Sequence, residues 1–370
     1  MILMKKLIPF LSVLLALSAC QPRKVVVRDT IPYVKQLAVD TAGTFSLVRS
    51  YLSAGTRGSI AIIGEPESSL SLAAAFEKAD RVDNIDGKPS PDRLPDFAGE
   101  SFDVVMDLYN APYLRLAVSS PDSLREVAVR NVVMAVDTVA YASALEPGTR
   151  LIKSKAKVFV LASSLLVECG QFDVDTLFKM AQREPLVITP VDAMLESAER
   201  AGCQRVAVWA PAPVKASYEE AARKTGLEVT FVPTSGSPLL RTAFREMLRQ
   251  YREARPDGVL DAVLVDSFTA DMDDLSAELE HIRRQITEED MSFDRLLAPH
   301  FRFIEPNGSL TDACYRLLRE RNLFTHDIAY PAVRYFRTEE NRDGGYVFVE
   351  IGKSYLSTTV NPGAYVPDLD

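Results

Sequence analysis

The stretch Ile60-Ala61-Ile62-Ile63-Gly64-Glu65-Pro66-Glu67-Ser68 decides the fold class of this chain of 370 residues. It joins a compact apolar run at 60–63 to a turn at 64–67, and an alanine- and leucine-rich segment follows at 68–79. Such a run predicts a buried strand, Gly and Pro mark a turn, and the third segment has the composition of a helix. The stretch therefore predicts a βα unit of a parallel sheet that helices cover on both faces.

Segments of the same two kinds recur along the chain. We predict further strands at 103–108, 131–136, 157–162, 205–209, 229–232, 259–265, 301–304 and 346–351. We predict helices at 44–54, from Pro190 to near Gly202, through Tyr218 and Ala222 up to Gly226, at 239–251, around Leu275, Leu279 and Ile282, and at 309–320.

Two of these helices begin with a recognisable N-cap. In Thr189-Pro190-Val191-Asp192 a hydroxyl precedes a proline at the first helical position and an acid at the third. Ser309, followed three residues later by Asp312, has the spacing of a capping box. Both patterns predict that a helix starts there, because they satisfy the free N–H groups of its first turn.

The predicted elements form two blocks of about four strand–helix units each, separated by a long connection. We therefore predict an α/β protein with two doubly wound, Rossmann-like lobes, whose parallel sheets face a central cleft. The expected divisions are a signal peptide at 1–19, a lipid anchor and tether at 20–40, an N-terminal lobe at 41–185, a second lobe at 186–335, and a C-terminal strand and tail at 336–370, with a return of this tail to the first lobe left open.

The N-terminus has the features of a secretion signal. Lys5 and Lys6 precede an apolar run at 7–17, which is too short to span a bilayer as a helix. The sequence Leu17-Ser18-Ala19-Cys20 resembles the lipobox of bacterial lipoproteins, and the resemblance implies that Cys20 is lipidated. We expect a lipid-anchored protein of the cell envelope that faces the periplasm, and Gln21, where inner-membrane lipoproteins carry Asp, favours the outer membrane.

Composition and motifs exclude several classes of function. With 42 Lys and Arg against 51 Asp and Glu, the net charge of −9 argues against a nucleic-acid partner. No glycine-rich nucleotide-binding loop occurs, so we expect no nucleotide cofactor. The acids Asp271, Asp273 and Asp274 fit the first turn of a helix better than a metal site, and no Gly-x-Ser-x-Gly elbow marks a hydrolase. Cys169, Cys203 and Cys314 match no metal motif. We therefore expect no cofactor and no metal.

The candidate ligand-binding residues lie at or just after the ends of the predicted strands. In open parallel sheets, ligands bind outside the carboxyl ends of the strands. The residues at these positions are polar and rich in hydroxyls and carboxylates, although such residues are also ordinary helix N-caps. The candidates are Gly64, Glu65, Ser68, Asp107, Tyr109, Asp137, Thr138, Ser163, Ser164, Pro211, Thr234, Ser235, Asp266 and Ser267.

Two resemblances to known families follow from these segments. Residues 193–232 and the run Asp261-Ala262-Val263-Leu264-Val265-Asp266 resemble the second lobe of type I periplasmic binding proteins. This resemblance implies that a small solute binds between the lobes and is delivered to a membrane transporter.

The second resemblance is to the aspartate/glutamate racemase group, which also has two lobes. It rests on Val132-Val133-Met134-Ala135-Val136-Asp137-Thr138 and on residues 210–218. The family uses two cysteine thiols as acid and base in these turns, whereas this chain has Asp137 in the first and no Cys in the second. We interpret this resemblance as a shared scaffold without the racemase thiol pair.

The sequence thus predicts a lipid-anchored, non-enzymatic protein that holds a small polar solute between two lobes. The acidic strand ends Asp107, Asp137 and Asp266 favour a ligand with cationic or hydroxyl groups. Two alternatives stay open. One is an enzyme on the same scaffold, in which a carboxylate or a tyrosine acts as the base, and the other is a scaffolding lipoprotein of the envelope.

Overall fold

The structure is a computed structural model, and it describes residues 28–40, 43–51, 55–84, 87–146, 150–325, 329–342, 344–352 and 356. The predicted signal peptide and the lipidation site at Cys20 lie outside these residues. The described residues from Ile31 onward belong to one compact unit. In the part of the chain that is described, no helix is both long enough and apolar enough to cross a membrane.

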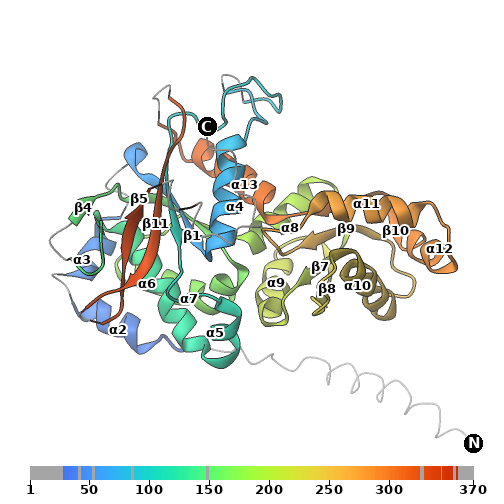
Figure 1. The fold of residues 1–370 in the computed structure, drawn as a ribbon, viewed down its shortest axis with the longest axis horizontal. Helices are drawn as coiled ribbons and strands as arrows, with labels where there is room; N and C mark the ends of the chain where they lie inside the picture. The colour runs from blue at the N-terminus through green and yellow to red at the C-terminus, as the bar shows by residue number, and fades with distance from the viewer. Residues whose placement is uncertain are drawn as a thin grey trace, which may run out of the picture. The chain divides into compact units, whose positions relative to one another are not determined.

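An eight-stranded sheet forms the centre of the first lobe (Figure 1). Its strand order is β4-β3-β12-β11-β2-β1-β5-β6, and β1 pairs in parallel with β2 and β5. Among the described strands of this sheet, the β11–β12 and β3–β4 pairs are antiparallel and the other pairs are parallel. The strands are β1 (Ser59–Gly64), β2 (Ser101–Met106), β3 (Val139–Tyr141), β4 (Arg150–Ile152), β5 (Ala156–Ala162), β6 (Val187–Ile188), β11 (Ala332–Glu340) and β12 (Tyr346–Ile351).

A four-stranded, fully parallel sheet forms the second lobe, with the order β10-β9-β7-β8. Its strands are β7 (Arg205–Ala210), β8 (Glu228–Pro233), β9 (Leu260–Val265) and β10 (Leu297–Ile304). The two sheets confirm the predicted fold class of two Rossmann-like α/β lobes.

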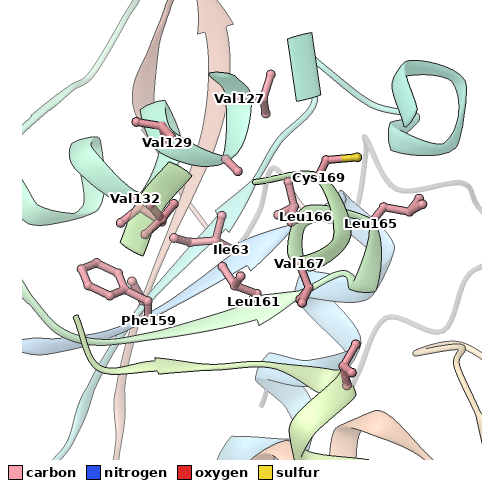
Figure 2. Close-up of a cluster of buried hydrophobic side chains, with 14 of the residues drawn as sticks. Ile63, Val127, Val129, Val132, Phe159, Leu161, Leu165, Leu166, Val167 and Cys169 are labelled. Carbon is pink, nitrogen blue, oxygen red and sulfur yellow. The ribbon is translucent and has the colours of Figure 1, made fainter. Parts of the chain in front are cut away.

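Helices cover both faces of the first sheet because successive strand residues point to opposite faces. Ile63 and Phe159 pack with Val132 of α6 and Leu166 of α7 in one buried cluster (Figure 2). On the other face, β1 and β5 residues pack against α4 and α13. The helices of this lobe are α2 (Pro32–Val39), α3 (Thr44–Arg49), α4 (Pro66–Lys78), α5 (Tyr113–Ser119), α6 (Pro121–Val136), α7 (Ser164–Met180) and α13 (Pro306–Glu320).

The second sheet is covered in the same way. Val206 and Leu264 pack toward α8 and α9, whereas Ala207 and Val263 pack toward Phe244 and the helices α10 and α11. The helices are α8 (Pro190–Arg200), α9 (Lys215–Ala222), α10 (Leu240–Ala254), α11 (Met272–Arg283) and α12 (Glu288–Asp294), and the short helix η2 (Ala212–Val214) precedes α9.

The predicted strand at 131–136 is wrong, because these residues form the last turns of helix α6. The β-branched run had indicated a strand. In the structure Val129, Val132, Val133 and Val136 recur at helical spacing and are buried together. Pro121 occupies the first turn of this helix, where a proline is well tolerated.

The two predicted N-caps have different outcomes. The Thr189 side chain accepts a hydrogen bond from the Asp192 N–H at 3.1 Å and caps α8, as predicted. The predicted capping box at Ser309 is wrong, since α13 begins earlier and its N-cap is Glu305. The Glu305 carboxylate accepts from the N–H groups of Asn307 and Gly308, at 2.7 and 2.6 Å.

Strand β11 has no counterpart among the predicted elements. It lies between β2 and β12, pairs in parallel with β2, and aligns Arg337 with Met106. This pairing places Thr338 next to the end of β2, where it contributes to the site described below.

Candidate functional site

The carboxyl ends of the two sheets meet at a direct hydrogen bond between the lobes. The Ser164 hydroxyl, in the first turn of α7 after β5, donates to Asp266 Oδ1 at 2.8 Å. Asp266 directly follows β9 of the second lobe. The sequence placed both residues at strand ends, and the structure brings them together.

Three further hydrogen bonds join the two lobes. The Ser71 hydroxyl of α4 donates to the carbonyl oxygen of Phe268 at 2.7 Å, and Asn307 Nδ2 donates to the same oxygen at 2.9 Å. At the start of α9, the Ser217 N–H donates to Glu168 of α7 at 2.7 Å. The loop that carries Asp266 is therefore held by α4, α7 and α13.

The Asp266 carboxyl is buried and only partly satisfied. Part of the residue reaches the surface, but Oδ2 is buried and has no hydrogen-bond partner among the described residues. Burial raises the pKa of Asp266 to about 6, although the hydroxyls of Ser164 and Tyr218 offset part of this effect. A carboxyl with this pKa exchanges its proton readily near neutral pH.

The Tyr218 side chain of α9 is the second ionisable group at this point. It is fully buried, and its hydroxyl lies near the Asp266 carboxyl, yet no hydrogen bond of normal geometry joins it to Oδ2 or to another group in the described part of the chain. Burial and the charge of Asp266 raise the pKa of Tyr218 well above its usual value. The two groups lie close enough to shift each other's ionisation, so Tyr218 stays protonated beside the Asp266 carboxyl.

A cavity of about 220 Å³ lies at the ends of β7 and β9. Its lining includes Trp209, Ser235, Leu240, Asp266 and Ser267. Thr234, another residue predicted from its strand-end position, lines it as well. Pro211 lies in the turn after β7, directly before η2.

The corresponding aspartate of the first lobe, Asp107 after β2, has a very different environment. It is fully buried, and four side chains donate to its carboxylate. The donors are Asn110 Nδ2 at 2.8 Å, the Tyr113 hydroxyl at 2.8 Å, Asn131 Nδ2 at 2.9 Å and Thr338 Oγ1 at 2.7 Å. Such a saturated carboxylate holds surrounding elements in place and has little capacity left for a ligand.

The remaining first-lobe candidates surround the end of β1. A side chain at Gly64 would come within 2.7 Å of the Ala162 carbonyl oxygen, so β1 and β5 require glycine there. Glu65 accepts from the Tyr113 N–H at 2.9 Å, and the Ser68 hydroxyl donates to the Glu65 carbonyl at 3.0 Å. Burial raises the pKa of Glu65; the Tyr113 N–H opposes this effect, and the charge of Asp107 adds to it.

Tyr109 and Ser163 lie at the same edge of the first sheet. The Tyr109 ring is 45% exposed and packs at a tilt against the Tyr346 ring, with 5.3 Å between ring centroids. Ser163 is the buried N-cap residue of α7, and its side chain makes no capping hydrogen bond.

Asp137 and Thr138 do not belong to the strand ends, contrary to the prediction. Asp137 is the C-cap residue of helix α6, and its carboxylate accepts from the N–H groups of Thr138 and Val139, at 2.6 and 3.2 Å. The racemase resemblance at 132–138 therefore falls on a helix end, whereas the second segment at 210–218 is indeed a strand end followed by a helix.

Sequence reasoning missed Trp209, Tyr218, Asn131 and Thr338 as site residues. Trp209 lies inside a strand and Tyr218 inside a helix, so neither occupies a position directly after a strand. The one available signal for Trp209 was its rarity, since it is the single tryptophan of the chain.

The three cysteines in the described part of the chain do not form a thiol pair. Cys169, Cys203 and Cys314 are all buried, and they lie in three separate segments, in α7, before β7 and in α13. Burial raises the pKa of Cys203 and, more strongly, that of Cys314, which disfavours their thiolates. No group of three or more His, Cys, Asp or Glu side chains among the described residues is placed to hold a metal ion.

Comparison with known proteins gives a structural likeness but no family. No protein-family model matches the chain, and no curated protein matches it either. Among solved structures, the glutamate racemase isoform RacE1 from Bacillus anthracis is 14% identical, with 77% of this chain and 90% of that chain covered and a TM-score of 0.50. The glutamate racemase from Francisella tularensis subsp. tularensis SCHU S4, in complex with D-glutamate, is 14% identical, with 78% and 91% covered and a TM-score of 0.48.

The glutamate racemase from Aquifex pyrophilus is 11% identical, with 76% of this chain and 89% of that chain covered and a TM-score of 0.48. At such identities the likeness concerns the fold. RacE1, whose TM-score reaches 0.50, is a glutamate racemase, and this finding contradicts the predicted non-enzymatic solute-binding and transport role. The resemblance to periplasmic binding proteins finds no support. The chain is thus similar in fold to glutamate racemases.

Proposed function

We propose that this protein is an enzyme that moves a proton to and from the carbon next to the carboxyl group of a small organic acid. The observation that carries this proposal is the buried Asp266 Oδ2, which has no hydrogen-bond partner among the described residues and lies where the two lobes meet. The racemase-like fold supports the same class of chemistry, since its relatives named above are glutamate racemases.

In the proposed step, Asp266 is the general base. Oδ2 takes the proton as the carbon–hydrogen bond breaks, and the electron pair of that bond delocalises into the neighbouring carboxyl group of the substrate. The protonated Asp266 then returns a proton to the carbon, and the base is restored. A base with a pKa of about 6 suits this task, because it is largely ionised at neutral pH and its conjugate acid is still a competent donor.

Ser164 and Tyr218 are positioning residues in this proposal. The Ser164 hydroxyl holds Oδ1, which leaves Oδ2 as the oxygen available for proton transfer. Tyr218 keeps its proton, so its hydroxyl acts as a neutral donor beside the carboxyl. One carboxyl thereby takes the place of the thiol pair that the described part of the chain lacks.

Access to Oδ2 requires movement, since this atom is buried between the lobes. A substrate reaches it only when the Ser164–Asp266 hydrogen bond opens. Closure over a bound substrate then excludes water, which strengthens electrostatic interactions within the site.

The experiment is proton exchange in deuterated water. The full chain is incubated with D- and L-glutamate, D- and L-aspartate, and D- and L-lactate, and exchange at the carbon next to the carboxyl is followed by proton NMR. We expect exchange with at least one of these acids, and a loss of about 100-fold or more in Asp266→Asn, the lower end of what a general base contributes.

The matched control is Asp137→Asn, which changes an aspartate that lies at the end of helix α6 and not at the end of a strand. This variant keeps its activity if Asp266 is the base. Absence of exchange with every acid, or full activity of Asp266→Asn, would contradict the proposed function.

A further inference from the structure

Two residues that line the cavity beside Asp266 carry buried donor groups with no acceptor among the described residues. Trp209 lines it and is only 4% exposed, yet its indole N–H has no partner among the described residues. The Ser235 hydroxyl, on the same cavity, is buried and likewise has no partner there. An indole N–H can only donate a hydrogen bond. A ligand that satisfies it must therefore carry an acceptor.

The first turn of helix α10 supplies further donors to the same cavity. Leu240 and Ala243 line it, and the N-cap residue Leu239 provides no side-chain cap. The first N–H groups of a helix lack partners within the helix and carry a partial positive charge. No acidic side chain occupies this first turn. The start of α10 is therefore suited to an anion, and the buried Trp209 N–H is a further donor beside it.

We infer that this cavity is a binding site for the carboxylate group of a small organic acid, held by Trp209, Ser235 and the first turn of α10. The inference rests on the proposed function in one respect, because it takes the bound acid to be the substrate of Asp266. Asp266 lines the same cavity, so an acid anchored there lies next to the proposed base.

The charges around the cavity oppose a phosphate more strongly than a carboxylate, because Asp266 is the one ionisable group among the described lining residues and, when ionised, it repels a doubly charged anion more than a singly charged one. No Lys, Arg or His belongs to its lining, and Arg241 at the start of α10 is already paired with Asp274. A phosphate of higher charge usually requires such cations, whereas neutral donors suffice for a single negative charge. The volume of about 220 Å³ also restricts the site to a small ligand.

The test uses the fluorescence of Trp209, which is the single tryptophan of the chain and therefore reports on this cavity alone. The full protein is titrated with acetate, malonate and D-glutamate, with acetamide as the neutral analogue and inorganic phosphate as the competing anion. We expect a saturable change with the carboxylates and none with acetamide.

Two variants test the contacts. Ser235→Ala should weaken carboxylate binding about tenfold or more, because a hydrogen bond to a charged group is lost. Ser276→Ala removes an exposed hydroxyl of α11 and serves as the matched control without effect. Trp209→Phe keeps a ring but removes the N–H, and its weaker binding is measured by calorimetry.

The outcomes separate this inference from the proposed function. Saturable binding without proton exchange leaves the carboxylate site standing and overturns the role of Asp266. Proton exchange that is unaffected by Ser235→Ala and Trp209→Phe overturns the carboxylate site alone. Tighter binding of phosphate than of any carboxylate, or no saturable response to any acid, also overturns it.

Discussion

Two buried aspartates follow strands at the carboxyl ends of the two sheets, and they differ in how completely their carboxylates are satisfied. Asp107 receives hydrogen bonds from four side chains, whereas Asp266 receives one from Ser164 and keeps Oδ2 without a partner among the described residues. The comparison teaches that burial alone does not identify a reactive carboxyl. A saturated carboxylate stabilises the fold, while an unsatisfied one is available for chemistry.

The largest change in stability is expected for Asp107→Ala. The variant leaves the buried donors of Tyr113, Asn131 and Thr338 without an acceptor, so the free energy of unfolding should fall by about 4 kcal/mol. Chemical denaturation monitored by circular dichroism measures this change. A loss of less than about 1 kcal/mol would mean that the Asp107 carboxylate contributes little to the stability of the fold, contrary to the role assigned to it here.

Asp266→Asn is expected to raise the free energy of unfolding, whereas Asp107→Ala lowers it. The folded-state pKa of about 6 lies above the ordinary value of 3.8, so the ionised carboxyl destabilises the folded protein at high pH. This destabilisation is complete above pH 6 and is relieved as the pH falls from 6 toward 3.8. At pH 8 the variant should be more stable than the wild type by about 3 kcal/mol, and at pH 5 by about half of that.

Denaturant titrations of both proteins at the two pH values test this prediction. Equal stability of the variant and the wild type at pH 8 would mean that the Asp266 carboxyl is not strained by burial. The proposed function also predicts that this variant loses activity, and a gain in stability together with a loss of turnover would set Asp266 further apart from Asp107.

A smaller effect is expected for Ser164→Ala, which removes the hydrogen bond between Ser164 and Asp266. Stability should fall by about 1 kcal/mol. The Ser164 hydroxyl lowers the pKa of Asp266, so its removal should raise that pKa and move the midpoint of the pH–rate profile to higher pH. A profile that stays in place would show that Ser164 does not act on the base.

The smallest effect is expected for Asn110→Ala. Asn110 is one of four side chains that donate to Asp107, and the other three remain when it is truncated. The free energy of unfolding should fall by less than about 1 kcal/mol, with no change in the pH–rate profile. Thermal unfolding and the proton-exchange assay check both expectations, and a larger loss than for Asp107→Ala is inconsistent with redundancy among the donors.

The positions of both aspartates were predictable from the sequence, because each directly follows an apolar run that forms a strand. Their different environments were not. Thr338 is 231 residues away from Asp107 along the chain, and Asn131 lies in a run of β-branched residues that indicated a strand. The partners of a buried carboxyl come from tertiary contacts, which local patterns do not encode.

The dependence on tertiary contacts also explains the errors in the predicted fold. The N-cap at Thr189 was predictable because its signal is local. Strand β11 was missed, since its Arg334, Arg337 and Glu339 interrupt an apolar pattern and its place in the sheet depends on pairing with β2. Asp137 was misplaced as a strand end for a related reason, because helix α6 was not recognised.

The loop that carries Asp266 has a kinetic consequence. Ser71 and Asn307 both donate to the Phe268 carbonyl, so opening the Ser164–Asp266 bond also strains two bonds made two residues further along. Opening is then a cooperative event, and we expect release of this loop to limit turnover more than bond breaking at carbon does. If opening of this loop limits the rate, the turnover number should fall as solvent viscosity rises. A rate that is independent of viscosity would argue against it.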